Sequence, residues 1–158
     1  MKIATVYLIG PSGVGKSGIA ASVASALSRY HLDLDRACKG WEGNWPVCLS
    51  AIEGARLEHP EGVIVDIGAG TQHEAGGKLA AYLSSVQGKV ILVTGDSMEV
   101  FGRNIAKTGW ADRSYDEYLN TEYTSRQTLN DLASGTVKVM GCDWDAAVRA
   151  SLGIVHEG

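Results

Sequence analysis

The most chemically informative stretch of the chain is a glycine-rich run close to Met1. It reads Gly10-Pro11-Ser12-Gly13-Val14-Gly15-Lys16-Ser17, which fits the pattern GxxxxGKS, and Gly18 follows it. Glycines allow the backbone to approach a ligand closely, so that successive N–H groups bind phosphate oxygens. A lysine at this position supplies a cation to the β- and γ-phosphates, and the serine hydroxyl is a ligand for Mg²⁺. The run therefore predicts a phosphate loop for ATP or GTP with Mg²⁺.

Acidic residues follow two of the apolar segments. Asp66 closes the run Val63-Ile64-Val65, and a carboxylate at the end of a buried strand is typical of a Mg²⁺ ligand in this class of nucleotide site. Asp33 and Asp35 lie two residues apart, so both point into one crevice if a strand ends between them. One is then a candidate general base for an acceptor hydroxyl, and the other a candidate neighbour of Mg²⁺. Simple turn or helix capping is the alternative for all three.

Aromatic and basic residues offer weaker indications. Trp41 and Trp45 either form one wall of an acceptor pocket or cover the edge of the core. Trp110 lies in a polar connector and is expected to pack there rather than to close over a nucleotide. Arg56 is expected on a solvated helix face.

Two further groups of polar side chains are given no functional role. The histidines lack metal-ligand spacing, and the acidic residues of one late helix are expected to face solvent. These residues are His31, His59, His73 and His156, and Asp116, Glu117 and Glu122.

The segments that must position these residues alternate between two patterns. Apolar runs of strand length are separated by stretches with helical periodicity. Strands are predicted at 2–9, 31–34, 62–67, 89–94 and 136–140, and helices at 16–30, 47–59, 76–86, 97–106, 115–133 and 143–152. A loop at 38–46 and a polar connector at 107–114 separate some of them. Such alternation, with a glycine loop after the first strand, predicts one doubly wound parallel α/β domain over residues 1–158.

Composition narrows the classes of partner. The 158 residues carry a formal net charge of −4 and 45% hydrophobic residues, which fits one globular domain. An acidic chain without a basic face argues against nucleic acid as the main partner, and no apolar run is long enough to span a membrane. Three scattered cysteines suggest neither a disulfide framework nor a zinc site, so we expect a reducing cytoplasm.

Four short motifs, taken together and in order, resemble the shikimate kinases. They are the phosphate loop, Asp33-Leu34-Asp35, Asp66-Ile67-Gly68-Ala69-Gly70-Thr71 and Arg126-Gln127-Thr128-Leu129. The resemblance implies a P-loop fold like that of the nucleoside monophosphate kinases, in three α/β/α layers. It also implies a five-stranded parallel sheet of order 2-3-1-4-5 and a mobile lid around residues 107–116.

The resemblance also implies roles for individual residues. Asp35 would contact the acceptor hydroxyl, and Asp33 would lie near Mg²⁺. Arg126 would grip a carboxylate of the acceptor. The residues of the glycine-rich loop, Gly68, Ala69 and Gly70, would face the acceptor. An arginine would stabilise the transferring phosphoryl group; Arg113 is the first choice for it and Arg103 the second.

Two departures from the family pattern bear on the acceptor. An arginine that belongs to the family's carboxylate clamp is replaced by the stretch Leu49-Ser50-Ala51, and the usual triple glycine carries the methyl group of Ala69. Loss of one bidentate anchor weakens recognition of the family's own acid. An acceptor other than shikimate is therefore predicted.

The sequence thus predicts an ATP- and Mg²⁺-dependent kinase for a hydroxyl of a small, anionic molecule, acting as a monomer or a homodimer. ATP is favoured over GTP because no guanine-reading Asn-Lys-x-Asp run follows the fourth strand, where Thr94-Gly95-Asp96-Ser97 stands. A nucleoside or nucleotide kinase and a non-enzymatic nucleotide-binding regulator are the alternatives.

Overall fold

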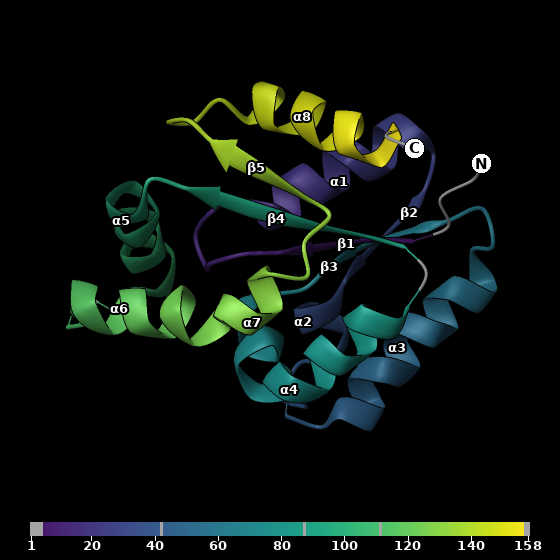
Figure 1. Cartoon of the computed structure of the whole chain (residues 1–158), viewed down its shortest axis with the longest axis horizontal. Coiled ribbons are helices and arrows are strands. Elements are labelled where there is room, and N and C mark those ends of the chain that lie inside the picture. Colours follow the sequence, from purple (N-terminus) through teal and green to yellow (C-terminus); the bar gives the residue numbers. More distant parts are fainter. Residues whose placement is uncertain (1–4, 42, 87, 111, 157–158) are drawn as a thin grey trace.

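A five-stranded, fully parallel sheet forms the centre of the computed structural model, which describes residues 5–41, 43–86, 88–110 and 112–156. The strand order β2-β3-β1-β4-β5 confirms the predicted order (Figure 1). The strands are β1 (Thr5–Ile9), β2 (Tyr30–Asp33), β3 (Val63–Asp66), β4 (Lys89–Gly95) and β5 (Gly135–Val139). Asp66 is in register with Leu8 on one side and with Asp33 on the other, so the carboxyl ends of three strands meet at one edge.

Helices cover both faces of the sheet because the central strand is apolar on both sides. Val6 and Leu8 pack in one core cluster with residues of α1 (Lys16–Leu27) and α8 (Trp144–His156). Tyr7 and Ile9 point to the opposite cluster, under α3 (Trp45–Glu58) and α4 (Ala69–Ser85). Figure 1 shows these two helical layers on either side of the strands. The three-layer architecture predicted from the sequence is confirmed.

The remaining helices lie near the carboxyl edge of the sheet or against the second layer. They are α2 (Leu34–Ala37), α5 (Ser97–Thr108), α6 (Tyr115–Glu122), the 3-10 turn η1 (Thr124–Arg126) and α7 (Gln127–Asn130). The predicted single helix over 115–133 is wrong, because it is broken into the last three of these. Tyr123 leaves helical geometry with φ −124° and ψ −65°, and its ring packs edge-on against Tyr118. No glycine or proline marks this break in the sequence.

Several other boundaries differ from expectation: α8 runs to His156 and not to residue 152, α5 runs to Thr108 and not to residue 106, and three further differences have a local cause or bear on the site. The helix predicted at 76–86 begins at Ala69, so Gly70 lies in its first turn. The helix predicted to begin at residue 47 begins at Trp45, because the Asn44 side chain accepts a hydrogen bond from the backbone N–H of Val47. Helix α1 ends at Leu27, three residues early, and Ser28 closes it in the left-handed conformation with φ 53°.

None of the described helices combines the length and the apolar character that a membrane span requires.

Candidate active site

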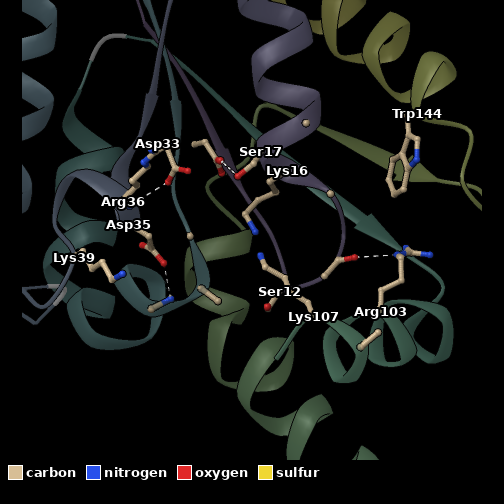
Figure 2. Close-up of a pocket in the computed structure, with 18 residues that line it drawn as sticks. Ser12, Lys16, Ser17, Asp33, Asp35, Arg36, Lys39, Arg103, Lys107 and Trp144 are labelled. Carbon is tan, nitrogen blue, oxygen red and sulfur yellow. Dashed lines mark hydrogen bonds between the residues drawn. The ribbon is translucent and has the colours of Figure 1, made fainter. Parts of the chain in front are cut away.

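A cavity of about 1000 Å³ opens at the carboxyl edge of the sheet, where the strand order reverses between β1 and its two neighbours. In doubly wound folds this is the usual place for a ligand. The phosphate loop forms its centre, and the three aspartates picked out in the sequence line it; Figure 2 labels two of them, Asp33 and Asp35. The structure therefore brings together the two groups of residues that the sequence placed in separate motifs.

The phosphate loop has the backbone shape that its glycines predict. Gly10 has φ 146°, and a Cβ there would lie 2.0 Å from the carbonyl oxygen of Val93. Gly15 has φ 95°, and a Cβ there would lie 2.6 Å from the indole ring of Trp144. Helix α1 begins directly after Gly15, so its free N–H groups face the cavity and favour an anion. Gly13 and Gly15 of the motif line the cavity, as does Gly18 directly after it, whereas Gly10 and Pro11 do not and Val14 is part of the core.

Lys16 is buried at the floor of the loop. Its side chain is 7% exposed, and its Nζ donates a 3.3 Å hydrogen bond to the carbonyl oxygen of Pro11. Burial lowers the pKa of Lys16 to about 8, and the nearby carboxylate of Asp66 only partly offsets this. An anion in the cavity would stabilise the charged form of this amine.

Ser17 and Asp66 form the closest polar pair in the cavity. The Ser17 hydroxyl donates a 2.5 Å hydrogen bond to Oδ2 of Asp66, a carboxylate that is 2% exposed. Burial acts to raise the pKa of Asp66, but the nearby imidazole of His31, the hydrogen bond from Ser17 and the charge of Lys16 leave that pKa lowered. His31, for which no role was predicted, lies with Nε2 3.8 Å from the same oxygen.

This oxygen pair fits the way proteins hold Mg²⁺. The described residues contain no cluster of three or more His, Cys, Asp or Glu side chains that would ligate a metal on their own. Magnesium sites in nucleotide enzymes need few, because phosphates and water complete the octahedron. Ser17 and Asp66 are therefore suited to a magnesium ion that arrives with a nucleotide, and Asp33 lines the same cavity.

Asp35 is fixed by the start of α4. Its Oδ1 accepts hydrogen bonds from the hydroxyl (2.6 Å) and the backbone N–H (3.2 Å) of Thr71, and Oδ2 accepts one from the N–H of Gly70 (3.2 Å). A Cβ on Gly68 would lie 2.1 Å from Oδ2, so the glycine leaves room for this carboxylate. The residues 68–70 do line the cavity, but the first of them faces Asp35, whereas the resemblance placed the acceptor there.

Asp33 is engaged at the start of the short helix α2. Its Oδ1 accepts a 3.2 Å hydrogen bond from the backbone N–H of Arg36. The capping role considered for this residue is therefore present, and the cavity still reaches it. Its predicted place beside a metal stays a prediction.

Further cations line the cavity, and of these only Arg103 was a candidate in the sequence, as the second choice for the arginine that stabilises the transferring phosphoryl group. Arg36 and Lys39 lie beside Asp35 at one end, Arg103 lies at the other end with the indole of Trp144, and Lys107 lies between the two ends, near Ser12 (Figure 2). The guanidinium of Arg103 lies 5.5 Å from the centre of the Trp144 ring, and its Nε donates to the carbonyl oxygen of Gly13 at 2.9 Å. The position of Arg36 and Lys39 just after the Asp33-Leu34-Asp35 motif was a signal that the sequence analysis did not use, and Trp144 had no such signal.

Of the arginines considered for phosphoryl transfer and acceptor binding, the second choice Arg103 lines this cavity, whereas Arg113 and Arg126 do not. Arg126 is 4% exposed and donates to Oε2 of Glu122 at 2.8 Å and to the carbonyl oxygen of Gly10 at 3.3 Å. Arg113 lies 3.4 Å from Oε1 of the same glutamate. Their predicted roles remain predictions. The expectation that Glu122 faces solvent is wrong, because this carboxylate is 4% exposed and pairs with both arginines.

The aromatic candidates lie elsewhere. Trp45 packs against Tyr82 within α3 and α4, and Trp41 is 60% exposed beside a shallow groove with Lys78. Neither lines the main cavity. Arg56 binds Glu53 on its own helix and lines a separate small cavity. The guanidinium of Arg113 lies 5.2 Å from the centre of the Trp110 ring.

No family model matches this sequence. Among solved structures, it is similar to a shikimate kinase from Acinetobacter baumannii in complex with shikimate, with a TM-score of 0.71 and 14% identity over 97% of this chain and 93% of that one. It is also similar to a gluconokinase from Sinorhizobium meliloti (TM-score 0.61, 22% identity, 98% and 92% covered) and to a shikimate kinase from Aquifex aeolicus (0.67, 18%, 94% and 93%).

Identities this low show the fold alone. The sheet order, the phosphate loop and the similarity over nearly the full length of both chains nevertheless point to the same fold. The chain has the fold of the shikimate-kinase-like P-loop kinases.

Proposed function

We propose that this protein is an ATP- and Mg²⁺-dependent phosphotransferase that phosphorylates a hydroxyl of a small, anionic molecule. The observation that carries the proposal is the pair Ser17–Asp66, 2.5 Å apart and beside buried Lys16, in the same cavity as the fixed carboxylate of Asp35. A loop that only binds a nucleotide needs no carboxylate in the position of Asp35. Phosphoryl transfer to an acceptor needs one, because the acceptor hydroxyl must be held in line with the phosphate.

The donor side of the cavity is suited to ATP. The N-terminus of α1 and Lys16 bind phosphate oxygens, while Ser17 and Asp66 hold the magnesium ion. That ion, when bound, neutralises charge that develops on the transferring group. Arg103 and Trp144, at the far end of the loop, offer a cation and an indole face to a flat heteroaromatic base.

The acceptor side is organised around Asp35. Its three hydrogen bonds fix a carboxylate that can orient the acceptor hydroxyl and receive its proton. The hydroxyl oxygen then bonds to the γ-phosphorus as the bond from that phosphorus to the ADP oxygen breaks. The displaced proton passes to Asp35 and on to solvent.

Charge at this end supports an anionic acceptor. If Asp33 and Asp66 are balanced by magnesium, Asp35 remains against the two cations Arg36 and Lys39, which leaves one positive charge for the acceptor. Both side chains are exposed at the cavity rim, and no ion-pair partner for either is found among the described residues. A carboxylate on a sugar acid or cyclic hydroxy acid would satisfy them. A nucleoside is less well matched, because the described lining at this end is charged and has no aromatic ring.

The experiment is a coupled assay of ADP release with ATP, Mg²⁺ and a panel of sugar acids, cyclic hydroxy acids, neutral sugars and nucleosides, with the product's mass as confirmation. We expect release that depends on an acid, and a loss of at least about tenfold in the Asp35→Asn variant with ADP affinity retained. Turnover with nucleosides alone would support the nucleoside kinase. Slow hydrolysis unchanged by every acceptor would argue against a metabolic kinase and for a regulator.

A further inference from the structure

Ser12, at the tip of the phosphate loop, is held at all three of its polar groups. Its backbone N–H donates to Oε2 of Glu122 at 3.2 Å, its carbonyl oxygen accepts from the Tyr118 hydroxyl at 3.2 Å, and its own hydroxyl accepts from Nδ2 of Asn104 at 3.0 Å. The three partners are each at most 4% exposed and come from α5 and α6. The shape of the loop therefore depends on the two helices that flank the connector around residues 109–114.

The same partners also hold Arg113, which belongs to that connector. Its Nη1 donates to Oδ1 of Asn104 at 2.9 Å, and its Nη2 lies 3.4 Å from Oε1 of Glu122. Its guanidinium also lies 5.1 Å from the ring centre of Tyr118. Each of the three side chains that fix Ser12 thus contacts Arg113 as well. A single side chain, such as Asn104 or Glu122, therefore connects Arg113 directly to Ser12.

Glu122 is the charged member of this cluster, and it is shared. Its Oε2 also accepts from Nη1 of Arg126 at 2.8 Å, and Arg126 in turn donates to the carbonyl oxygens of Gly10 and Ala69, both at 3.3 Å. One buried carboxylate therefore faces two buried guanidinium groups. Removing one of these side chains leaves a buried charge of the others without its partner. The fully hydrogen-bonded cluster is therefore favoured over arrangements in which one of its ion pairs is broken.

We propose that Glu122 is a positioning residue that links the phosphate loop to the connector. It holds Arg113 in place as long as it also accepts the hydrogen bond from the Ser12 amide. The inference rests on the proposed use of a nucleotide. It predicts that the placement of Arg113 and the occupancy of the loop are energetically coupled, and that the coupling is reciprocal. A purely structural glutamate would affect the stability of the whole domain, and the placement of Arg113 would then respond to ADP binding no more than that of any other residue.

The test follows tryptic cleavage of the Arg113–Ser114 bond by mass spectrometry, with and without ADP and Mg²⁺. Glu122→Gln keeps an oxygen for the Ser12 amide and removes the charge that holds both arginines; Glu117→Gln, on an exposed site of the same helix, is the matched control. In the wild type and the control, ADP should slow this cleavage. In Glu122→Gln, cleavage should be at least about fivefold faster without ADP, and ADP should no longer slow it, although its Kd stays within about threefold.

Cleavage after Arg149, exposed on α8, and the melting temperature separate this result from general unfolding. Parallel acceleration at both sites would overturn the proposal, as would unchanged cleavage at Arg113 in a folded Glu122→Gln protein. If Glu122→Gln does not fold, Arg113→Lys breaks the two-pronged contact from the other end, keeps a tryptic site, and should show the same loss of protection by ADP. Absence of ADP binding by the wild type would instead contradict the proposed function itself, and with it this inference.

Discussion

The carboxylate of Asp35 occupies the space that a side chain at Gly68 would fill. A Cβ at residue 68 would lie 2.1 Å from Oδ2 and 2.3 Å from Cγ of that aspartate. The two residues come from different strands' ends, and the carboxylate is tied to the first turn of α4 by Gly70 and Thr71. A glycine at position 68 is therefore a condition for placing the proposed base.

The first prediction concerns this contact. Gly68→Ala should push Asp35 out of its position and lower the acceptor-dependent kcat by at least about tenfold, while the Kd for ADP changes by less than about threefold. The matched control is Gly76→Ala, within the helix α4 that follows Gly68, where an added Cβ meets nothing within 4 Å. That variant should keep full activity and gain about 0.5–1 kcal/mol in stability. Equal activity of the two variants would contradict the role given to Asp35.

The second prediction concerns magnesium. Asp66→Asn and Ser17→Ala each remove one of the two oxygens suited to the ion, so Mg²⁺ should no longer tighten ADP binding in either variant. In the wild type we expect Mg²⁺ to tighten it by at least about tenfold. Calorimetric titration with and without EDTA measures this, and Ser84→Ala, exposed on α4, is the control. A magnesium effect preserved in both variants would assign the ion to other residues.

The third prediction concerns protons. Because burial lowers the pKa of Lys16 to about 8, most of this amine is neutral at pH 8.5 in the ligand-free protein. Phosphate beside it raises that pKa again, so ADP binding at pH 8.5 should take up a proton, and binding at pH 7.2 should take up much less. Calorimetry in two buffers of different ionisation enthalpy measures the uptake.

Lys16→Arg provides the control for that measurement, because an arginine stays charged throughout this range. It should bind ADP with no more uptake at pH 8.5 than at pH 7.2. Equal uptake at both values in the wild type would show that Lys16 is already charged before the nucleotide arrives.

The fourth prediction concerns recognition of the acceptor. Reversing the charge in Arg36→Glu or Lys39→Glu should raise the KM for an acid acceptor by at least about tenfold and leave the KM for ATP within about twofold. Arg149→Glu makes the same change in charge on an exposed part of α8 and should alter neither. If instead Arg126→Lys alone raises the KM of the acid, the carboxylate is bound where the family resemblance placed it.

The fifth prediction separates base from phosphate. Trp144→Ala should weaken binding of ADP by about 1–2 kcal/mol through loss of the indole face, but should leave binding of pyrophosphate nearly unchanged. Trp41→Ala, at an exposed indole outside the main cavity, is the matched control. Equal weakening of both ligands by Trp144→Ala would mean that this ring supports Gly15 rather than the base.

The donor half of the site was predictable from the sequence because it is local. The glycines, Lys16 and Ser17 lie within one turn between a strand and a helix, and Asp66 ends a continuous apolar run. The sheet order followed from the resemblance, and the structure confirms it.

The acceptor half was less accessible because it depends on contacts between distant segments. The periodicity of the sequence does not show that the start of α4 binds Asp35. It also does not show that Glu122 is buried and pairs with two arginines. Helical periodicity was in fact misleading there, since it joined α6, η1 and α7 into one exposed helix. Trp144 was missed for the same reason, because its contact with Gly15 spans nearly the whole chain.

The four-residue helix α2 separates two tasks within the cavity. It follows the end of β2 and contains Arg36, and Lys39 lies just beyond it, while the residues proposed for magnesium and phosphate, Lys16, Ser17 and Asp66, belong to α1 and β3. If the proposed function is right, we expect a change in the sequence of this short segment to alter the preference for the acceptor and to leave nucleotide binding unchanged. Diversification of substrate range within this architecture is therefore expected to concentrate in residues 36–44, and chimaeras that swap this segment alone should transfer acceptor preference.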